Sequence, residues 1–188
     1  MKSVLEKILL TPDECQYFID FFESDKCVVL KPFESLLKKT DANRVGTTAA
    51  VPESVIPKGF FSKLDYFNVL PFNYIGAHNV THGLRINKYE QGQWMAEHKD
   101  DSVVNYNTKD VSRTRRWKSI IFQLSDTLDY SGGDLMLEGK PVKRDRGTVI
   151  CFNADMLHSV TPVTSGARYS MILWLEKKDF NLGKAPLI

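Results

Sequence analysis

The sequence predicts an α+β fold that is mainly β, with a jelly roll in its C-terminal half and helices packed on one sheet. After residue 80, short apolar runs alternate with turn residues, which is typical of strands joined by tight turns. Before residue 80, an amphipathic pattern of helical spacing follows a helix start signal. A length of 188 residues suits one domain with a substantial core. We therefore predict a single domain over residues 1–188.

Residues 1–80 are expected to support the rest of the fold. Thr11 can cap a helix, Pro12 suits its first position, and Glu14 lies three residues after the cap. An apolar stripe of helical spacing follows and consists of Cys15, Phe18, Ile19 and Phe22. The sequence thus predicts an amphipathic helix that packs on the outside of a sheet.

The remaining segments before residue 84 are assigned by composition. Residues 26–33 predict a short strand, and the aromatic-rich residues 60–70 predict a second helix. Residues 40–58 mix β-branched residues with two prolines, which predicts a strand followed by a mobile loop; whether this segment forms a lid is left open by the sequence. Residues 73–81 are expected to connect to a strand that begins at Leu84.

Residues 81–176 are expected to form the β core. Gly132 and Gly133 supply a tight turn within it. Residues 113–118 are basic, with Trp117 among the cations, and are interpreted as a solvated loop; the alternative is a patch that attracts an acidic peptide or a phosphate. After the strand at Leu84, the expected strands cover residues 119–124, 134–137, 148–152 and 169–175.

Composition limits the environment and the partners. The net charge of +2 gives no reason to expect nucleic acid as a partner. Three cysteines without CxxC spacing disfavour a disulfide framework or a zinc site. The N-terminus carries Glu6 and Lys7 within its apolar stretch and does not resemble a signal peptide. With no run of about 18 apolar residues, we expect a cytoplasmic protein that does not contact membranes.

Three side chains form a candidate metal site. His98 and Asp100 are two residues apart, so in an extended segment both point to one face. His158 follows the strand expected at residues 148–152 and can supply a third ligand. Two histidines and one carboxylate with open positions are the facial triad of non-haem Fe(II) oxygenases. His78 and His82 lie in a polar stretch and are interpreted as surface residues.

Arg168 opens the last core strand, ten residues after His158. A cation at the head of an apolar strand favours a buried carboxylate partner, because a buried guanidinium is costly unless it is paired. Residues 168, 170, 172 and 174 would share a face, so Ser170 and Trp174 can line the same pocket. A purely structural place for Trp174 in the core remains the competing interpretation.

The ordered set of these residues resembles the 2-oxoglutarate and Fe(II)-dependent oxygenases, in particular the prolyl 4-hydroxylase-like subgroup. The resemblance covers roughly residues 84–176. It implies the double-stranded β-helix form of the jelly roll, also called cupin-like. The residues that carry it are Tyr89-x-x-Gly92, His98-x-Asp100, Gly132-Gly133, His158 and Arg168.

The resemblance also implies roles. His98, Asp100 and His158 would bind Fe(II), and Arg168 would hold the distal carboxylate of 2-oxoglutarate. Tyr89 and Gln123 would contact the same cosubstrate, with O2 as the second cosubstrate and ascorbate as a possible reductant. The reaction implied is hydroxylation of a C–H bond with release of succinate and CO2. Trp174 and Arg116 are the candidates for the substrate pocket.

The substrate is left open by the sequence. A peptidyl proline is the first expectation, with a protein or peptide as partner. The same chemistry on a free amino acid, a small metabolite or a nucleobase is the alternative. A jelly-roll binding module without turnover, and a nucleic-acid binder that uses residues 113–118, are hypotheses from other classes.

Overall fold

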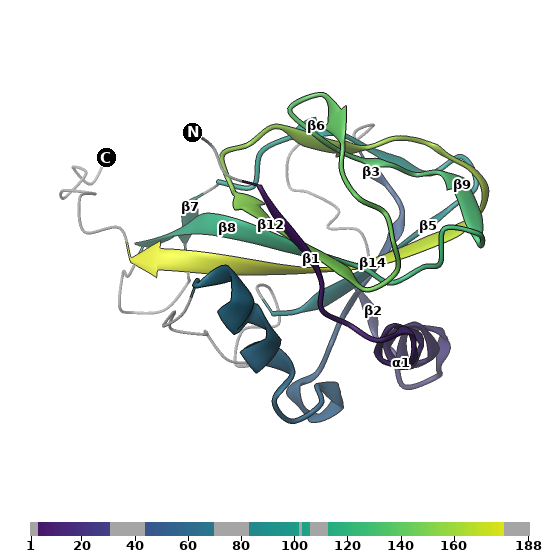
Figure 1. Cartoon of the computed structure of the whole chain (residues 1–188), viewed down its shortest axis with the longest axis horizontal. Helices are drawn as coiled ribbons and strands as arrows, with labels where there is room; N and C mark the ends of the chain where they lie inside the picture. The colour runs from purple at the N-terminus through teal and green to yellow at the C-terminus, as the bar shows by residue number, and fades with distance from the viewer. Residues whose placement is uncertain (1–3, 31–43, 70–82, 102, 106–112, 179–188) are drawn as a thin grey trace.

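A computed structural model describes residues 4–30, 44–69, 83–101, 103–105 and 113–178. Within these ranges the chain forms two antiparallel β-sheets that face each other, with helices on the outer side of the larger sheet (Figure 1). The fold is therefore mainly β, and the predicted α+β class with a jelly-roll core is confirmed.

The larger sheet runs in the order β1-β12-β8-β14-β5-β4-β2, with β7 paired to β8 and β9 paired to β14. The smaller sheet runs in the order β11-β10-β13-β6-β3. The strands of the larger sheet are β1 (Leu5–Ile8), β2 (Val29–Leu30), β4 (Thr47–Ala50), β5 (Arg85–Glu90), β7 (Val103–Asn105), β8 (Arg113–Gln123), β9 (Tyr130–Gly132), β12 (Thr148–Asn153) and β14 (Val163–Lys178). Those of the smaller sheet are β3 (Arg44–Val45), β6 (Trp94–His98), β10 (Leu135–Leu137), β11 (Lys140–Pro141) and β13 (His158–Val160).

The helix α1 (Pro12–Glu23) begins at the predicted capping box. The Thr11 hydroxyl accepts a hydrogen bond from the Glu14 backbone N–H at 3.2 Å, and the Glu14 carboxylate accepts one from the Thr11 N–H at 2.8 Å. These bonds satisfy two backbone donors that the first turn would leave unpaired. The buried stripe of Cys15, Phe18 and Phe22 then fixes which face packs on the sheet.

The second helical segment differs in type from a regular α-helix. It is a 3₁₀ helix, η2 (Phe60–Phe67), and a shorter one, η1 (Glu53–Val55), precedes it. Gly59 and Asn68, at its two ends, both adopt left-handed backbone angles, which limits the segment to eight residues. Phe60, Leu64 and Phe67 are its buried side chains.

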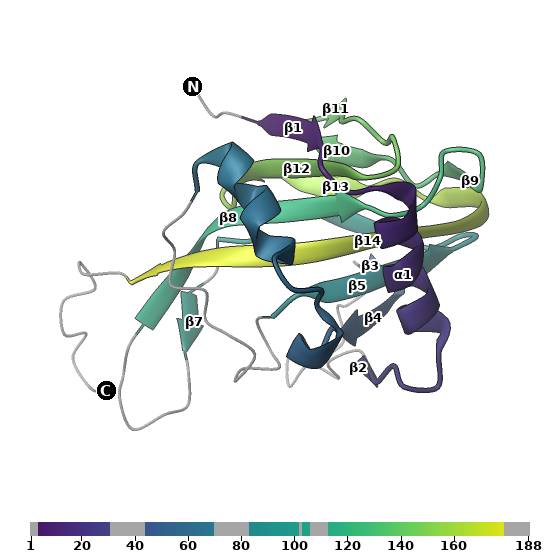
Figure 2. The ribbon, with the colours of Figure 1, turned by 60° about the horizontal axis from the view of Figure 1, so that its bottom comes forward.

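Two apolar layers lie on the two faces of the larger sheet. Figure 2 shows α1 and η2 crossing the outer face of that sheet. There Phe60 of η2 packs between Phe18 of α1 and Phe122 of β8, with ring centroids 5.3 and 5.5 Å apart. Ile121, the neighbour of Phe122, belongs instead to the cluster between the two sheets. Strand alternation thus lets β8 contribute side chains to both layers.

Some segments differ from the predicted boundaries. Residues 113–118 are not a solvated loop but the first half of β8, which pairs with β14 along this stretch. The strand predicted at residues 169–175 is part of the longer β14. Strand β1 was not predicted, because its sequence shows no alternation of apolar and polar residues. Its apolar residues Leu5 and Ile8 are in fact exposed (41 and 58%), so no buried face gives rise to such a pattern.

The strand expected at residues 26–33 is described only as the two-residue β2. The segment expected as a strand and a loop contributes β3, β4 and η1. The connection expected at 73–81 lies outside the described residues, and so do His78 and His82. Among the described helices, none is long and apolar enough to cross a membrane.

Candidate metal centre

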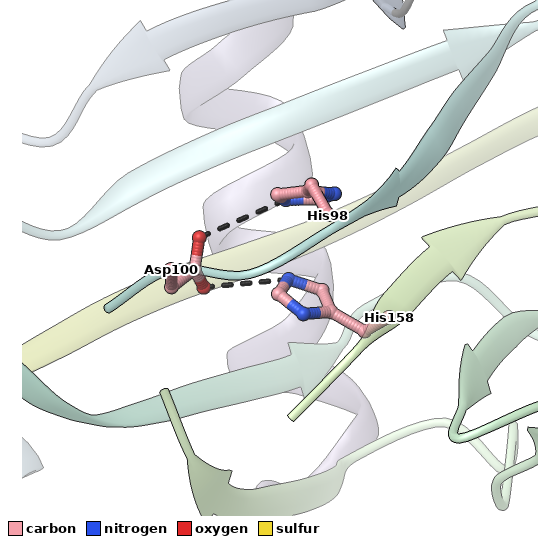
Figure 3. Close-up of side chains that lie close together, drawn as sticks. All are labelled: His98, Asp100 and His158. Atoms are coloured by element: carbon pink, nitrogen blue, oxygen red, sulfur yellow. Dashed lines mark ion pairs between the residues drawn. The ribbon is translucent and has the colours of Figure 1, made fainter. Parts of the chain in front are cut away.

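The three predicted metal ligands meet between the two sheets. β6 ends at His98 and β13 begins at His158, and these two residues are partners in the ladder between the strands. Asp100 follows β6 by two residues and is held there because its backbone N–H donates to the Ala154 carbonyl at 2.8 Å. Figure 3 shows the three side chains converging. One ligand atom from each lies within 4.8 Å of the others.

Backbone carbonyls fix the orientation of both imidazoles. Nδ1 of His98 lies 2.9 Å from the Ala96 oxygen, and Nδ1 of His158 lies 3.0 Å from the Met156 oxygen. A carbonyl oxygen only accepts hydrogen bonds, so each Nδ1 must carry a proton. Each Nε2 therefore faces the site, which is the arrangement that orients histidine as a metal ligand.

Asp100 completes the donor set. Its two carboxylate oxygens lie 3.7 Å from His98 Nε2 and 3.4 Å from His158 Nε2, and the Ser119 hydroxyl donates to Oδ2 at 2.7 Å. Asp100 and His158 are buried, whereas His98 is partly exposed. Two imidazole nitrogens and one carboxylate oxygen on one side of a point fit a divalent ion such as Fe(II) and leave positions open for other ligands.

The buried pair Asp100 and His158 stabilise each other's charged form. Burial would raise the pKa of Asp100, but the hydrogen bond and charge of His158, helped by Ser119, hold that pKa well below 3.8. The Trp174 indole contributes in the same direction, although its N–H lies beyond strict hydrogen-bonding geometry. Burial would lower the pKa of His158, but Asp100 outweighs it and raises that pKa above 6.5. Protonation of His158 and binding of a cation therefore compete for the same imidazole nitrogen.

A cavity of about 230 Å³ extends from the metal ligands between the sheets. The residues expected to bind iron, cosubstrate or substrate line this cavity with one exception; those that line it are His98, Asp100, His158, Arg168, Tyr89, Trp174 and Arg116. Ser170 and Ile172 line it as well, so the alternate residues of β14 share one face as predicted. Gln123 is the exception, because it lies behind Arg168 and is not part of the lining.

Arg168 is a buried cation whose partners are neutral. It is 1% exposed, and its guanidinium donates to Gln123 Oε1 at 2.8 Å and to Ser170 Oγ at 3.3 Å. Its Nε has no hydrogen-bond partner among the described residues. Its ladder partner Tyr89 places its ring centroid 5.8 Å from the guanidinium. A buried charge with only neutral partners favours the entry of an anion.

Two glycines let other groups approach these side chains. Gly133 has a positive φ of 63°, and a Cβ there would lie 2.9 Å from Val163 and 3.1 Å from the Arg168 stem. A Cβ on Gly46 would lie 3.0 Å from the Tyr89 ring. The Gly132-Gly133 turn therefore also makes room for Arg168, which adds to its expected role as a turn.

The sequence analysis missed Arg85, Asn87 and Ser119. Arg85 and Asn87 line the cavity with Tyr89, and the two-residue spacing was the available signal. Ser119 is fully buried and opens an apolar run, so a lone hydroxyl there was the sign of a buried polar partner.

Comparison with known proteins agrees with this geometry. The family model described as the 2OG-Fe(II) oxygenase superfamily matches residues 84–176, about half of the chain. A PKHD-type hydroxylase of Idiomarina loihiensis is 35% identical over 95 residues, which are 48% of this chain and 40% of that relative. The chain thus spans less than half the length of this curated relative.

Solved structures share the fold at low identity. The viral collagen prolyl hydroxylase of Paramecium Bursaria Chlorella virus-1, in a 2OG complex, aligns with a TM-score of 0.63 at 18% identity, covering 93% of this chain and 96% of that chain. A prolyl hydroxylase of Trichoplax adhaerens, in complex with a peptide fragment of hypoxia inducible factor, aligns with a TM-score of 0.61 at 17% identity, covering 92% and 82%. Through residues 84–176, the chain belongs to the 2OG-Fe(II) oxygenase superfamily and is similar to its prolyl hydroxylase-like members.

Proposed function

We propose that this chain is an Fe(II)- and 2-oxoglutarate-dependent dioxygenase that hydroxylates an unactivated C–H bond. The observation that carries the proposal is the triad of His98, Asp100 and His158, which lines the same cavity as the buried cation Arg168. When bound, Fe(II) and 2-oxoglutarate supply the oxidation by O2 and yield succinate and CO2. The protein supplies geometry and a site shielded from water.

Each residue then has a defined task. His98, Asp100 and His158 would hold the iron on one side, with both Nε2 atoms directed at the metal by the bonds at Nδ1. Arg168 would hold the distal carboxylate of 2-oxoglutarate, and Tyr89 would contact the same molecule. Gln123 would act through Arg168, since its Oε1 accepts from the guanidinium and its Nε2 donates to the Lys143 carbonyl at 3.2 Å.

A peptidyl proline is the substrate we propose first, with a protein or peptide as partner. It is supported by the solved neighbours, whose names describe prolyl hydroxylases and, in one case, a complex with a peptide. Trp174 and Arg116 line the cavity with the metal ligands and would contact this substrate. A free amino acid or another small molecule would use the same chemistry.

The first experiment supplies purified protein with Fe(II), ascorbate, 2-oxoglutarate, air and a panel of proline-containing peptides. Succinate and peptide mass are followed together. We expect succinate coupled to the gain of one oxygen on proline. Succinate without a hydroxylated peptide would redirect the search to other substrates. If the protein binds neither metal nor 2-oxoglutarate, a jelly-roll binding module without turnover becomes the better description.

Loss of a ligand should abolish turnover. We expect His98→Ala and Asp100→Ala each to lower succinate formation by about 1,000-fold or more, because the metal is the source of the reactivity. Glu97→Ala is the matched control, since Glu97 lies on β6 beside His98 but is exposed. Full activity in either ligand variant would contradict the assignment.

A further inference from the structure

Ser119 supports Asp100 from behind the metal centre. Its side chain is fully buried, and its hydroxyl donates to Asp100 Oδ2 at 2.7 Å. It is not among the residues that line the cavity into which the metal ligands point, so it would touch neither the metal nor the cosubstrate. An effect of Ser119 on the metal centre must therefore act through the Asp100 carboxylate.

Asp100 depends on such support because it lies beyond the end of β6, outside the strand ladder. A chain of hydrogen bonds replaces the ladder there. The Asp100 N–H donates to the Ala154 carbonyl at 2.8 Å, and the Ala154 N–H donates to the Trp117 carbonyl at 3.0 Å. Ser119, two residues after Trp117 on β8, closes the ring through its bond to the carboxylate. Both the backbone and the side chain of Asp100 are thus tied to β8.

The support of Asp100 differs in kind from that of the two histidines. Nδ1 of His98 and Nδ1 of His158 each face a backbone carbonyl, and a side-chain substitution does not remove a carbonyl. The bond to Asp100 comes from a side chain, so one substitution deletes it. Ser119 therefore gives a way to change the carboxylate while both imidazoles stay oriented.

The bond from Ser119 limits how the carboxylate can bind a metal. An ionised carboxylate has two acceptor oxygens and binds metals through one or both of them. Here Oδ2 already accepts a short hydrogen bond of 2.7 Å, as expected when the acceptor is charged. Binding through both oxygens would turn Oδ2 away from Ser119 and leave a buried hydroxyl without its acceptor, which is costly.

We propose that Ser119 is a positioning residue that keeps Asp100 a one-oxygen ligand of the metal. This inference rests on the proposed function and adds how the open positions of the metal are preserved. An octahedral ion that takes one atom from each of the three ligands keeps positions for the keto acid end of 2-oxoglutarate and for O2. Without Ser119, the metal becomes the partner of Oδ2, and the second carboxylate oxygen fills one of these positions.

The test counts the water molecules on the bound metal and does not require turnover. Mn(II) replaces Fe(II), because its unpaired electrons speed the relaxation of water protons according to the number of coordinated water molecules. Each protein is loaded with Mn(II), saturated with 2-oxoglutarate, and compared by water-proton relaxation. Electron paramagnetic resonance of free Mn(II) measures how much metal is bound.

The unaltered protein should keep a coordinated water in the complex with 2-oxoglutarate. In Ser119→Ala the second oxygen of Asp100 should replace this water, so we expect the relaxation enhancement to fall by about two-fold or more. Ser119→Thr keeps the hydroxyl and should restore the enhancement. Thr148→Val is the matched control, since Thr148 is a fully buried residue of β12 that does not line the cavity; its enhancement should be unchanged.

Three results would overturn the inference. These are an unchanged enhancement in Ser119→Ala, an equal loss in Ser119→Ala and Ser119→Thr, or no binding of Mn(II) by Ser119→Ala. The second would assign the effect to packing, and the third would mean that Ser119 holds the carboxylate in place altogether. If the unaltered protein binds no Mn(II), the inference and the proposed metal centre fail together. If it binds Mn(II) as expected but forms no succinate with Fe(II) in air, the role of Ser119 stands and the oxygenase reaction does not.

Discussion

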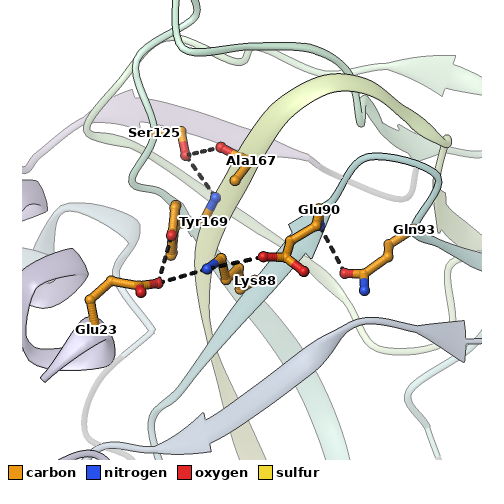
Figure 4. A network of polar contacts seen from close by, with 7 residues as sticks. All are labelled: Glu23, Lys88, Glu90, Gln93, Ser125, Ala167 and Tyr169. Carbon is orange, nitrogen blue, oxygen red and sulfur yellow. Dashed lines mark hydrogen bonds and ion pairs between the residues drawn. The ribbon is translucent and has the colours of Figure 1, made fainter. Parts of the chain in front are cut away.

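The ladder between β5 and β14 presents a cation on each of its faces. On one rung, Arg168 pairs with Tyr89, and both point into the cavity. On the next rung, Tyr169 pairs with Lys88, and both point to the outer face, where they meet Glu23 of α1 (Figure 4). The same strands therefore build the candidate cosubstrate site on one side and a helix-to-sheet contact on the other.

The two faces differ in how their charges are satisfied. Lys88 lies 3.0 Å from Glu23 and 3.2 Å from Glu90, and the Tyr169 hydroxyl donates to Glu23 at 2.6 Å. Burial would lower the pKa of Lys88, but these partners outweigh it and raise that pKa. Arg168, in contrast, donates among the described residues to the neutral groups of Gln123 and Ser170. The outer cation has its carboxylates in place, whereas the inner cation is set up to receive one.

The sharpest test of this difference replaces the cation on each face. Arg168→Met should weaken 2-oxoglutarate binding by about 2–5 kcal/mol, roughly 30-fold to several thousand-fold, because a buried anion would lose its partner. Lys88→Met, on the neighbouring rung, should leave this affinity unchanged. Calorimetric titration of the Fe(II)-loaded protein with 2-oxoglutarate measures both. Equal effects in the two variants would remove the distinction between the faces.

A smaller loss of 2-oxoglutarate affinity is expected when a substitution places a carboxylate beside Arg168. Gln123→Glu would place an anion against Arg168 and compete with the cosubstrate, weakening 2-oxoglutarate binding by about 10- to 100-fold, as expected for a bond to a charged group. Gln123→Met, which removes the bond without adding charge, should weaken it less. If Gln123→Glu binds as tightly as Gln123→Met, the charge of Arg168 does not control cosubstrate affinity.

The dependence of Tm on pH should also differ between the metal-free and the metal-loaded protein, because His158 lies at the metal centre. Without metal, the raised pKa of His158 stabilises the fold below its ordinary value of 6.5, and this contribution is lost as pH rises through the raised pKa. We expect Tm to fall over this interval by roughly 2–4 °C for each kcal/mol lost. Metal binding needs neutral imidazole and should strengthen over the same interval.

Thermal scans of metal-free and metal-loaded protein from pH 5 to pH 9 compare the two trends. In the loaded protein His158 is already deprotonated, so the fall in Tm should be absent. Parallel curves in the two forms would show that the proton of His158 and the metal do not compete for one place.

The sequence was most informative where one strand defined both spacing and face. The alternate residues from Arg168 to Trp174 could be placed together because side chains alternate along a strand. The same two-residue spacing placed Asp100 beside His98, although Asp100 lies just beyond the end of β6. Gln123 was expected to contact the cosubstrate directly, but it bonds to Arg168 and does not line the cavity. Residue spacing alone does not show which of two neighbouring side chains faces the cavity. Arg85 contacts Trp174 from a neighbouring strand, and strand order cannot be read from spacing.

The smallest expected effect lies on the outer face. Tyr169→Phe removes the bond to Glu23 and should cost about 0.5–1.5 kcal/mol, with no change in 2-oxoglutarate affinity. Tyr17→Phe is the matched control, because Tyr17 donates to the Val55 carbonyl at 2.8 Å, an acceptor that does not titrate. Both variants should show a modest loss of Tm near neutral pH.

Acid then separates these two tyrosines. The Tyr169 hydroxyl holds the pKa of Glu23 below its ordinary value of 4.5, against the effect of burial. This stabilisation is present above pH 4.5 and is lost as pH falls through the lowered pKa. The Tm difference between unaltered protein and Tyr169→Phe should therefore shrink in acid, while that of Tyr17→Phe persists. A constant difference for Tyr169→Phe would mean that the Glu23 charge does not strengthen the contact between α1 and the sheet.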